Sequence, residues 1–215
     1  MADFRRLVAA SLLAGILAGL LLSILQHYQT LPLILAAERF ETPDPGHVHD
    51  WQPEDGWQRN LLTVLFNGLT GFGFALLLTG AMYWRGDGGY QRGLAWGVGG
   101  YLVFFAAPSL GLPPELPGTD SAALHSRQAW WLFTAVATGI GLSGLFLSQN
   151  RLLQIAGAIL LIVPHLIGAP HPAVIHASAP EALQHSFVLM SSISNGLFWL
   201  TLGGLSGWLL PKFTL

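Results

Sequence analysis

Residues 7–25 read LVAASLLAGILAGLLLSIL, a run of nineteen positions without a charged side chain. A helix that crosses the hydrocarbon core of a bilayer needs about 20 such residues, so this stretch predicts a membrane-spanning helix. Arg5 and Arg6 precede it, as basic residues precede a signal peptide, but the apolar run is too long and no small-x-small cleavage site follows it. We therefore expect an uncleaved first helix at about residues 7–27.

The rest of the chain repeats this pattern. Only 9% of the residues are charged and 52% are hydrophobic, whereas a soluble domain carries about a quarter charged residues. Further stretches without Asp, Glu, Lys or Arg follow, and none alternates as a barrel strand does. The helices are expected at about residues 7–27, 60–83, 93–110, 128–147, 152–168 and 187–210. The sequence thus predicts a single membrane domain over residues 1–215. Its fold class is an all-α integral membrane protein, a bundle of about six transmembrane helices with Pro- and His-rich outer loops.

Composition excludes several functions. Nine Lys and Arg with a net charge of -2 leave no basic face for a nucleic acid. The absence of Cys excludes disulfides, zinc–thiolate sites and thiol nucleophiles. There is no H-E-x-x-H motif and no glycine-lysine nucleotide loop. We expect neither an enzyme nor a resident cofactor; eight His and eleven carboxylates remain as the chemically active groups.

The basic residues predict the orientation. With six spans, one side of the membrane holds Arg5, Arg6, Arg85, Arg92, Arg151 and Lys212, and the other holds Arg39, Arg59 and Arg127. Because loops rich in Lys and Arg stay in the cytoplasm, both termini are expected to be cytoplasmic in a multi-pass protein of the inner membrane. Nine of the eleven carboxylates then lie outside.

All eight histidines fall on the outer side of this topology. His27 ends the first helix, and the outer loop 28–59 contains His47-Val-His49 beside Asp50. His125 lies in the second outer loop, and the remaining histidines are His165, His171, His176 and His185. Imidazole suits borderline divalent metals such as Co, Ni and Zn, and carboxylate adds charge. The histidines therefore predict a metal site on the outer face.

Two proline-rich segments contribute the strongest candidate ligands. Pro164-His165 and Pro170-His171-Pro172 hold their imidazoles in a stiffened backbone, which lowers the entropy cost of ordering a site. The segment 111–118, GLPPELPG, holds Glu115 in the same way at the end of the third expected helix. The alternatives remain open: His47 and His49 can be ordinary loop residues, and Glu115 can simply pair with Arg127.

A few residues inside the spans also stand out. Asn67 and Asn195 are strongly polar side chains within the membrane, and they can mark a translocation path or bond neighbouring helices. The many glycines favour close helix packing. Five tryptophans are expected at the membrane interfaces as aromatic anchors: Trp57, Trp84, Trp130, Trp131 and Trp208.

Several of these motifs together resemble the CbtA family of proposed cobalt transporter subunits. They are His47-Val-His49, Trp51-Gln-Pro-Glu-Asp-Gly56, Arg59, Thr63, Asn67, Gly71-Phe-Gly-Phe-Ala-Leu76, the segment 111–118, Arg127-Gln-Ala-Trp-Trp131 and Pro164-His-Leu-Ile-Gly-Ala-Pro170. The resemblance covers nearly the whole chain. It implies an integral membrane protein linked to cobalamin metabolism and cobalt uptake, paired with a small single-span, histidine-bearing partner called CbtB.

The sequence therefore predicts a subunit of a transition-metal uptake transporter that captures divalent metal, Co²⁺ first and Ni²⁺ as an alternative, at its outer face. The metal ligands are expected to be His47, His49, Glu115, His165, His171, His176 and His185, with Asn67 and Asn195 along the translocation path. The rival is a membrane metal sensor or assembly partner that does not transport, which needs the outer site but no path.

Overall fold

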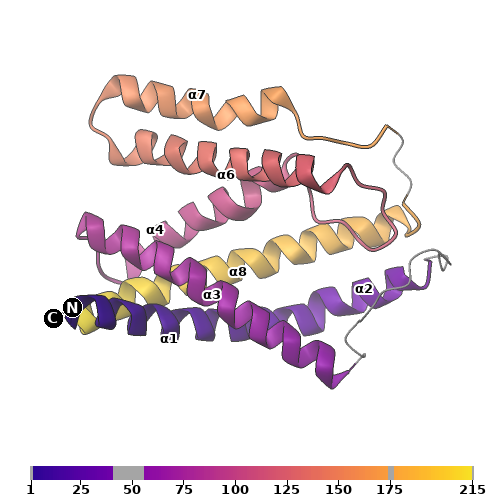
Figure 1. The fold of residues 1–215 in the computed structure, drawn as a ribbon, viewed down its shortest axis with the longest axis horizontal. Helices are drawn as coiled ribbons and strands as arrows, with labels where there is room; N and C mark the ends of the chain where they lie inside the picture. Colours follow the sequence, from indigo (N-terminus) through magenta and orange to yellow (C-terminus); the bar gives the residue numbers. More distant parts are fainter. Residues whose placement is uncertain (1, 41–55, 174–176, 215) are drawn as a thin grey trace.

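The computed structural model describes residues 2–40, 56–173 and 177–214, and within these ranges the chain is helical with no strand (Figure 1). Six helical rods follow one another along the chain. They are α1 (Ala2–Leu25) with η1 (Gln26–Thr30) and α2 (Leu31–Glu38), α3 (Trp57–Arg85), α4 (Tyr90–Tyr101) with η2 (Leu102–Ala106) and α5 (Ala107–Ser109), α6 (Leu124–Leu147), α7 (Arg151–Ile167), and α8 (Glu181–Thr214). The predicted all-α membrane fold is confirmed.

Four of the rods are long and apolar enough to cross a bilayer: Phe4–Glu38, Trp57–Arg85, Leu124–Leu147 and Glu181–Lys212. The apolar helix α7 has 17 residues, at the lower edge of the length that a span needs. The third rod is interrupted by the π-helical turn η2. The six expected helices are thus present, although they differ in length and regularity.

The first rod corrects the prediction that a loop begins at residue 28. The chain remains helical through Glu38, because the apolar segment after Thr30 forms a further helix, α2, with Pro32 in its first turn. Proline has no N–H to donate and its ring clashes with the carbonyl four residues back. The helix widens just before it into a π-turn, in which the Leu31 N–H bonds the Gln26 carbonyl, five residues back. Pro108 follows η2 at the same spacing.

The rods pack in pairs, and glycines at the contacts let the two backbones approach closely. α1 packs on α3, α4 on α8, and α6 on α7. A Cβ on Gly71 would overlap the Gly15 carbonyl oxygen, and a Cβ on Gly93 would overlap that of Gly203. Gly157 of α7 fits the α6 backbone in the same manner. Small residues let membrane helices approach this closely, so the packing role expected for the glycines holds at these positions.

The largest apolar core forms where α1 packs against both α3 and α8. It joins three alanines and a leucine of α1 and one alanine of α3 to larger side chains of α8: Ala10, Ala14, Ala18, Leu22, Ala75, Phe198, Trp199, Leu202 and Leu209. The α6–α7 pair is set to one side and meets the rest of the bundle through η2 and α5. Both termini lie at the same end of the bundle (Figure 1), as an even number of spans requires.

The opposite end carries a layer that we call the loop cap, made of residues 31–40, 110–123 and 177–185. Its core joins Ala37, Leu116 and Ala179 from the three segments. The Leu116 N–H donates to Gln184 Oε1 at 3.1 Å, and Gln184 Nε2 donates to the Pro114 carbonyl at 2.8 Å. The loops at residues 110–123 and 177–185 are therefore fixed to each other and to α2.

The tryptophans divide between surface and core. Trp57, Trp84 and Trp208 are exposed, as expected of interface anchors. The prediction is wrong for Trp130, which is only 7% exposed. Its ring lies over Gly111, which has no room for a Cβ, and beside Ala169.

Candidate functional site

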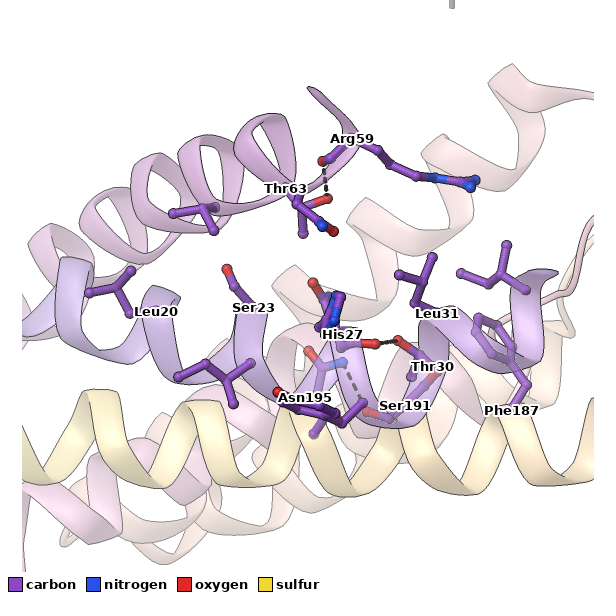
Figure 2. A pocket seen from close by; sticks show the side chains of 17 residues that line it. Leu20, Ser23, His27, Thr30, Leu31, Arg59, Thr63, Phe187, Ser191 and Asn195 are labelled. Atoms are coloured by element: carbon purple, nitrogen blue, oxygen red, sulfur yellow. Dashed lines mark hydrogen bonds between the residues drawn. The ribbon is translucent and has the colours of Figure 1, made fainter. Parts of the chain in front are cut away.

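A cavity of about 520 Å³ opens where the first rod widens at η1, and its walls combine apolar surface with a group of polar side chains (Figure 2). Its walls come from η1 and the adjoining turns of α1 and α2, from the first turns of α3, and from α8. The polar residues that line it are Ser23, Gln26, His27, Thr30, Arg59, Asn60, Thr63, Ser191, Ser194 and Asn195. Apolar side chains such as Leu20, Leu31 and Phe187 complete the walls. It is a concentration of polar groups within a largely apolar bundle.

The π-turn explains why this part of the first rod is polar. An i→i+5 turn holds one extra residue, so it shifts the side chains around it relative to a regular helix, and such turns are frequent at functional sites. The five residues of the turn are Gln26-His-Tyr-Gln-Thr30, and the segments on either side are apolar. Pro32 therefore creates the turn, and the turn brings polar side chains into the bundle.

The inner wall of the cavity is braced by hydrogen bonds. Asn67 Nδ2 donates to Ser23 Oγ at 3.0 Å and to Gln26 Oε1 at 2.7 Å, which ties α3 to the first rod. Ser194 Oγ donates to Gln29 Oε1 at 2.9 Å, which ties α8 to it. The interhelical bonding considered for Asn67 in the sequence analysis is thus what the structure shows.

The Asn195 amide oxygen and the His27 ring are among the polar groups that remain available to a solute. Asn195 Nδ2 donates to the Ser191 carbonyl at 3.0 Å within α8 (Figure 2), and its Oδ1 accepts no hydrogen bond from the described residues. The His27 ring packs edge-on against Tyr28, with centroids 5.0 Å apart, and its nitrogens have no hydrogen-bond partner in the described part of the chain. An imidazole nitrogen and an amide oxygen therefore line one cavity as potential ligands.

An ion pair lies beside the cavity on the side of the loop cap. Arg59 Nη2 lies 2.9 Å from Glu38 Oε1, and both side chains are about a third exposed. Arg59 is a cavity residue, and its carbonyl accepts a hydrogen bond from Thr63 Oγ1 at 2.8 Å. The Glu38 carboxylate offsets the positive charge that Arg59 would otherwise direct at a cation in the cavity.

The structure separates several of the predicted ligands. Glu115 Oε2 lies 2.9 Å from Arg127 Nη2, so the pairing considered as an alternative is present. His165 is half-buried, with its ring centroid 6.3 Å from that of Trp130. His171 is exposed, and His185 lies 3.3 Å from Glu181 in an exposed pair. Within residues 2–40, 56–173 and 177–214, no three His, Asp or Glu side chains are grouped as a metal site.

Three of the predicted ligands, His47, His49 and His176, lie outside the described residues. Asn195 is the one predicted path residue that lines the cavity directly, whereas Asn67 braces its wall. His27 was not predicted as a cavity residue, because the sequence pattern places this histidine at the end of the first helix. The polar run Gln26–Thr30 just before Leu31-Pro32 was the signal that could have identified it.

A scan of protein families gives one decisive match. The model of the probable cobalt transporter subunit CbtA matches residues 4–211 of the chain. The chain belongs to the CbtA family. No curated protein and no solved structure gives a match. CbtA membership assigns the chain to a family of transporter subunits, which work with other subunits, and it agrees with the membrane-spanning helices.

Proposed function

We propose that this CbtA chain is the membrane subunit of a cobalt uptake transporter, with Ni²⁺ as an alternative cargo. It captures the divalent metal at a His and Glu site on its outer face and passes it into the cavity beside η1. The observation that carries this proposal is the cavity itself. Polar side chains gathered on one wall inside a membrane-spanning bundle are expensive to maintain, and such groups usually serve a function.

The chemistry of the cavity suits a metal in transit. Imidazole, amide oxygen and hydroxyl groups bind borderline divalent ions, and His27, Asn195 and Ser191 supply all three. No Asp or Glu belongs to the described lining, so an ion there is held without a direct carboxylate ligand. A conducting site must bind firmly enough to admit an ion and weakly enough to release it.

Capture is assigned to the outer loops. His47 and His49 make the first contact, and Glu115, His165 and His171 form the site nearest the bundle, with His176 and His185 as supporting ligands. The loop cap supports this assignment, because it fixes the segments of Glu115 and of His185 to each other. Carboxylates on this face raise the local concentration of cations.

We also propose a location, an orientation and a partner for the protein. The protein lies in the inner membrane with both termini in the cytoplasm, which the six-to-three division of basic residues supports. Its partner is a small single-span, CbtB-like subunit. The chain is a transporter subunit and catalyses no reaction of its own.

The test is accumulation of radioactive cobalt in cells that make the chain with and without its small partner, against nickel and zinc as competitors. The proposal predicts uptake that excess unlabelled cobalt abolishes. Replacing His165 and His171 together by Ala should lower uptake by more than about tenfold, because each lost ligand leaves the coordination incomplete. Replacing the exposed loop residue His125 by Ala should not. Metal binding without accumulation would support the sensor or assembly partner instead.

A further inference from the structure

One face of α6 carries a row of buried polar atoms. Trp130 Nε1, Thr134 Oγ1 and Thr138 Oγ1 are inaccessible to solvent and have no hydrogen-bond partner among the described residues. They are spaced four residues apart, so they lie above one another on the same side of the helix. The row spans ~12 Å along the axis, at a rise of 1.5 Å per residue. It begins near the loop cap and runs toward the end that holds the termini.

Eight other hydroxyls in the described helices behave differently. They donate to the carbonyl four residues back in their own helix: Ser11, Ser23, Thr30, Thr63, Thr79, Ser143, Ser186 and Ser192. This bond is available to any Ser or Thr inside a helix. Thr134 and Thr138 do not make it, although each is almost completely buried. Buried polar groups normally have a partner, so these two hydroxyls point to a ligand outside their own helix.

The row faces α7. At its loop-cap end, the Trp130 ring lies near the His165 ring. At its other end, Gly141 meets Gly157 and Leu161 of α7. Between them α7 contains the buried Pro164, which has no N–H and so leaves the Leu160 carbonyl without its helical donor. The α6 side of the contact thus presents an N–H donor and two hydroxyls, and α7 has a carbonyl without a helical donor one turn before Pro164.

We propose that the α6–α7 contact binds a file of water molecules along Trp130, Thr134 and Thr138. Water both donates and accepts, so it can satisfy the Trp130 N–H, the two hydroxyls and the Leu160 carbonyl in turn. A metal cation cannot, because it would meet the positive end of the Trp130 N–H. An anion would be buried without a counter-charge, which is far more costly than burying water.

The bound water molecules form a row that runs from His165 to about the middle of α6. A polar solute released from the loop-cap end then meets hydrogen-bonding groups on this side of the bundle as well as in the cavity beside η1. The inference does not depend on the identity of the transported metal, and its test does not involve transport.

The direct test is hydroxyl-radical labelling of the full chain in detergent, with oxidation read by mass spectrometry. Water bound beside a buried side chain delivers radicals that bulk water cannot. Trp130 should be oxidised several-fold more than Trp199, which is 2% exposed and packed against Phe74 and Phe104. Equal protection of the two tryptophans would overturn the proposal.

Variants supply a second readout. Replacing Thr134 and Thr138 together by Val keeps the side-chain shape and removes the hydroxyls, so Trp130 labelling should fall toward the level of Trp199 and Tm should drop. Ser206→Ala is the matched control, because Ser206 Oγ is also buried without a partner in the described chain but lies on α8; its Tm should not drop. A higher Tm for the Thr variant, or undiminished Trp130 labelling, would show that the contact is dry. If the variant fails to fold, the comparison of Trp130 with Trp199 in the unaltered chain still decides.

Discussion

At the scale of single residues, the Glu115 carboxylate has two possible roles, as the ion-pair partner of Arg127 and as a proposed metal ligand. Its carboxylate bonds Arg127 across 2.9 Å, with both side chains more than a quarter exposed. An ion pair this accessible contributes at most about 1 kcal/mol to stability. The pair therefore does not prevent Glu115 from binding a metal ion, since a divalent cation can displace Arg127 at small cost.

Glu115→Gln and Arg127→Gln separate the two roles. Both remove the ion pair and should lower the free energy of unfolding by about 1 kcal/mol or less; Arg127→Gln also removes the exposed hydrogen bond from Arg127 Nη1 to Ser121 Oγ. Only Glu115→Gln removes a metal ligand, so it should reduce cobalt uptake the more strongly. The measurements are thermal unfolding in detergent and cobalt accumulation in cells. Equal uptake by the two variants would restrict Glu115 to its pairing with Arg127.

At the scale of elements, glycines and a proline determine how the first rod packs and bends. Gly71 fits against Gly15 with no space for a Cβ, whereas a Cβ on Gly73 would meet nothing within 4 Å. The π-turn before Pro32 sets the polar wall of the cavity. Each feature gives one prediction with an internal control.

Gly71→Ala should destabilise the bundle, because the new methyl group overlaps the α1 backbone and overpacking costs about 1–3 kcal/mol. Gly73→Ala should be neutral or stabilising, by up to about 1 kcal/mol, because alanine favours the helix and the space is open. Thermal unfolding of the two variants in the same detergent provides the comparison. A loss of stability in Gly73→Ala equal to that in Gly71→Ala would contradict the packing of α1 on α3.

Pro32→Ala restores an N–H at the position that forces the π-turn, so the first rod can become regular. Because proline inside a helix costs about 3 kcal/mol relative to alanine, the variant should be at least as stable as the unaltered chain. Its cobalt uptake should nevertheless fall, because Gln26 and His27 rotate away from the cavity. A stable Pro32→Ala protein with unchanged uptake would show that the turn has no role in transport.

How far the sequence predicts these elements depends on the kind of signal. Runs of apolar residues without charge predict the rods well, because the bilayer imposes length and apolarity. The end of the first helix was mispredicted, since a polar run before a proline resembles a helix end and here produces a π-turn instead. The burial of Trp130 was also missed, because it depends on the distant Gly111 and Ala169. The pairing of Glu115 with Arg127 was predicted only as an alternative, since two opposite charges in the segment between two expected helices can equally be apart.

At the scale of the whole molecule, the two ends of the bundle differ. The termini share one end and the loop cap occupies the other (Figure 1), with the η1 cavity below the cap. The basic residues concentrate at the end of the termini, which predicts that this end faces the cytoplasm. A reporter fused after Leu215 should therefore be active only if it is a cytoplasmic reporter. Activity of a periplasmic reporter there would reverse the direction of transport proposed for the chain.

The central claim is that metal passes through the cavity beside η1, and His27 tests it most directly. The measurement is the initial rate of radioactive cobalt accumulation in cells that make the chain with its partner subunit, for the unaltered chain, His27→Ala and His125→Ala. Loss of the cavity imidazole should lower the rate by more than about tenfold, as loss of a ligand does at metal sites, while His125→Ala should retain the full rate. Uptake by His27→Ala at the rate of the unaltered chain would contradict the claim.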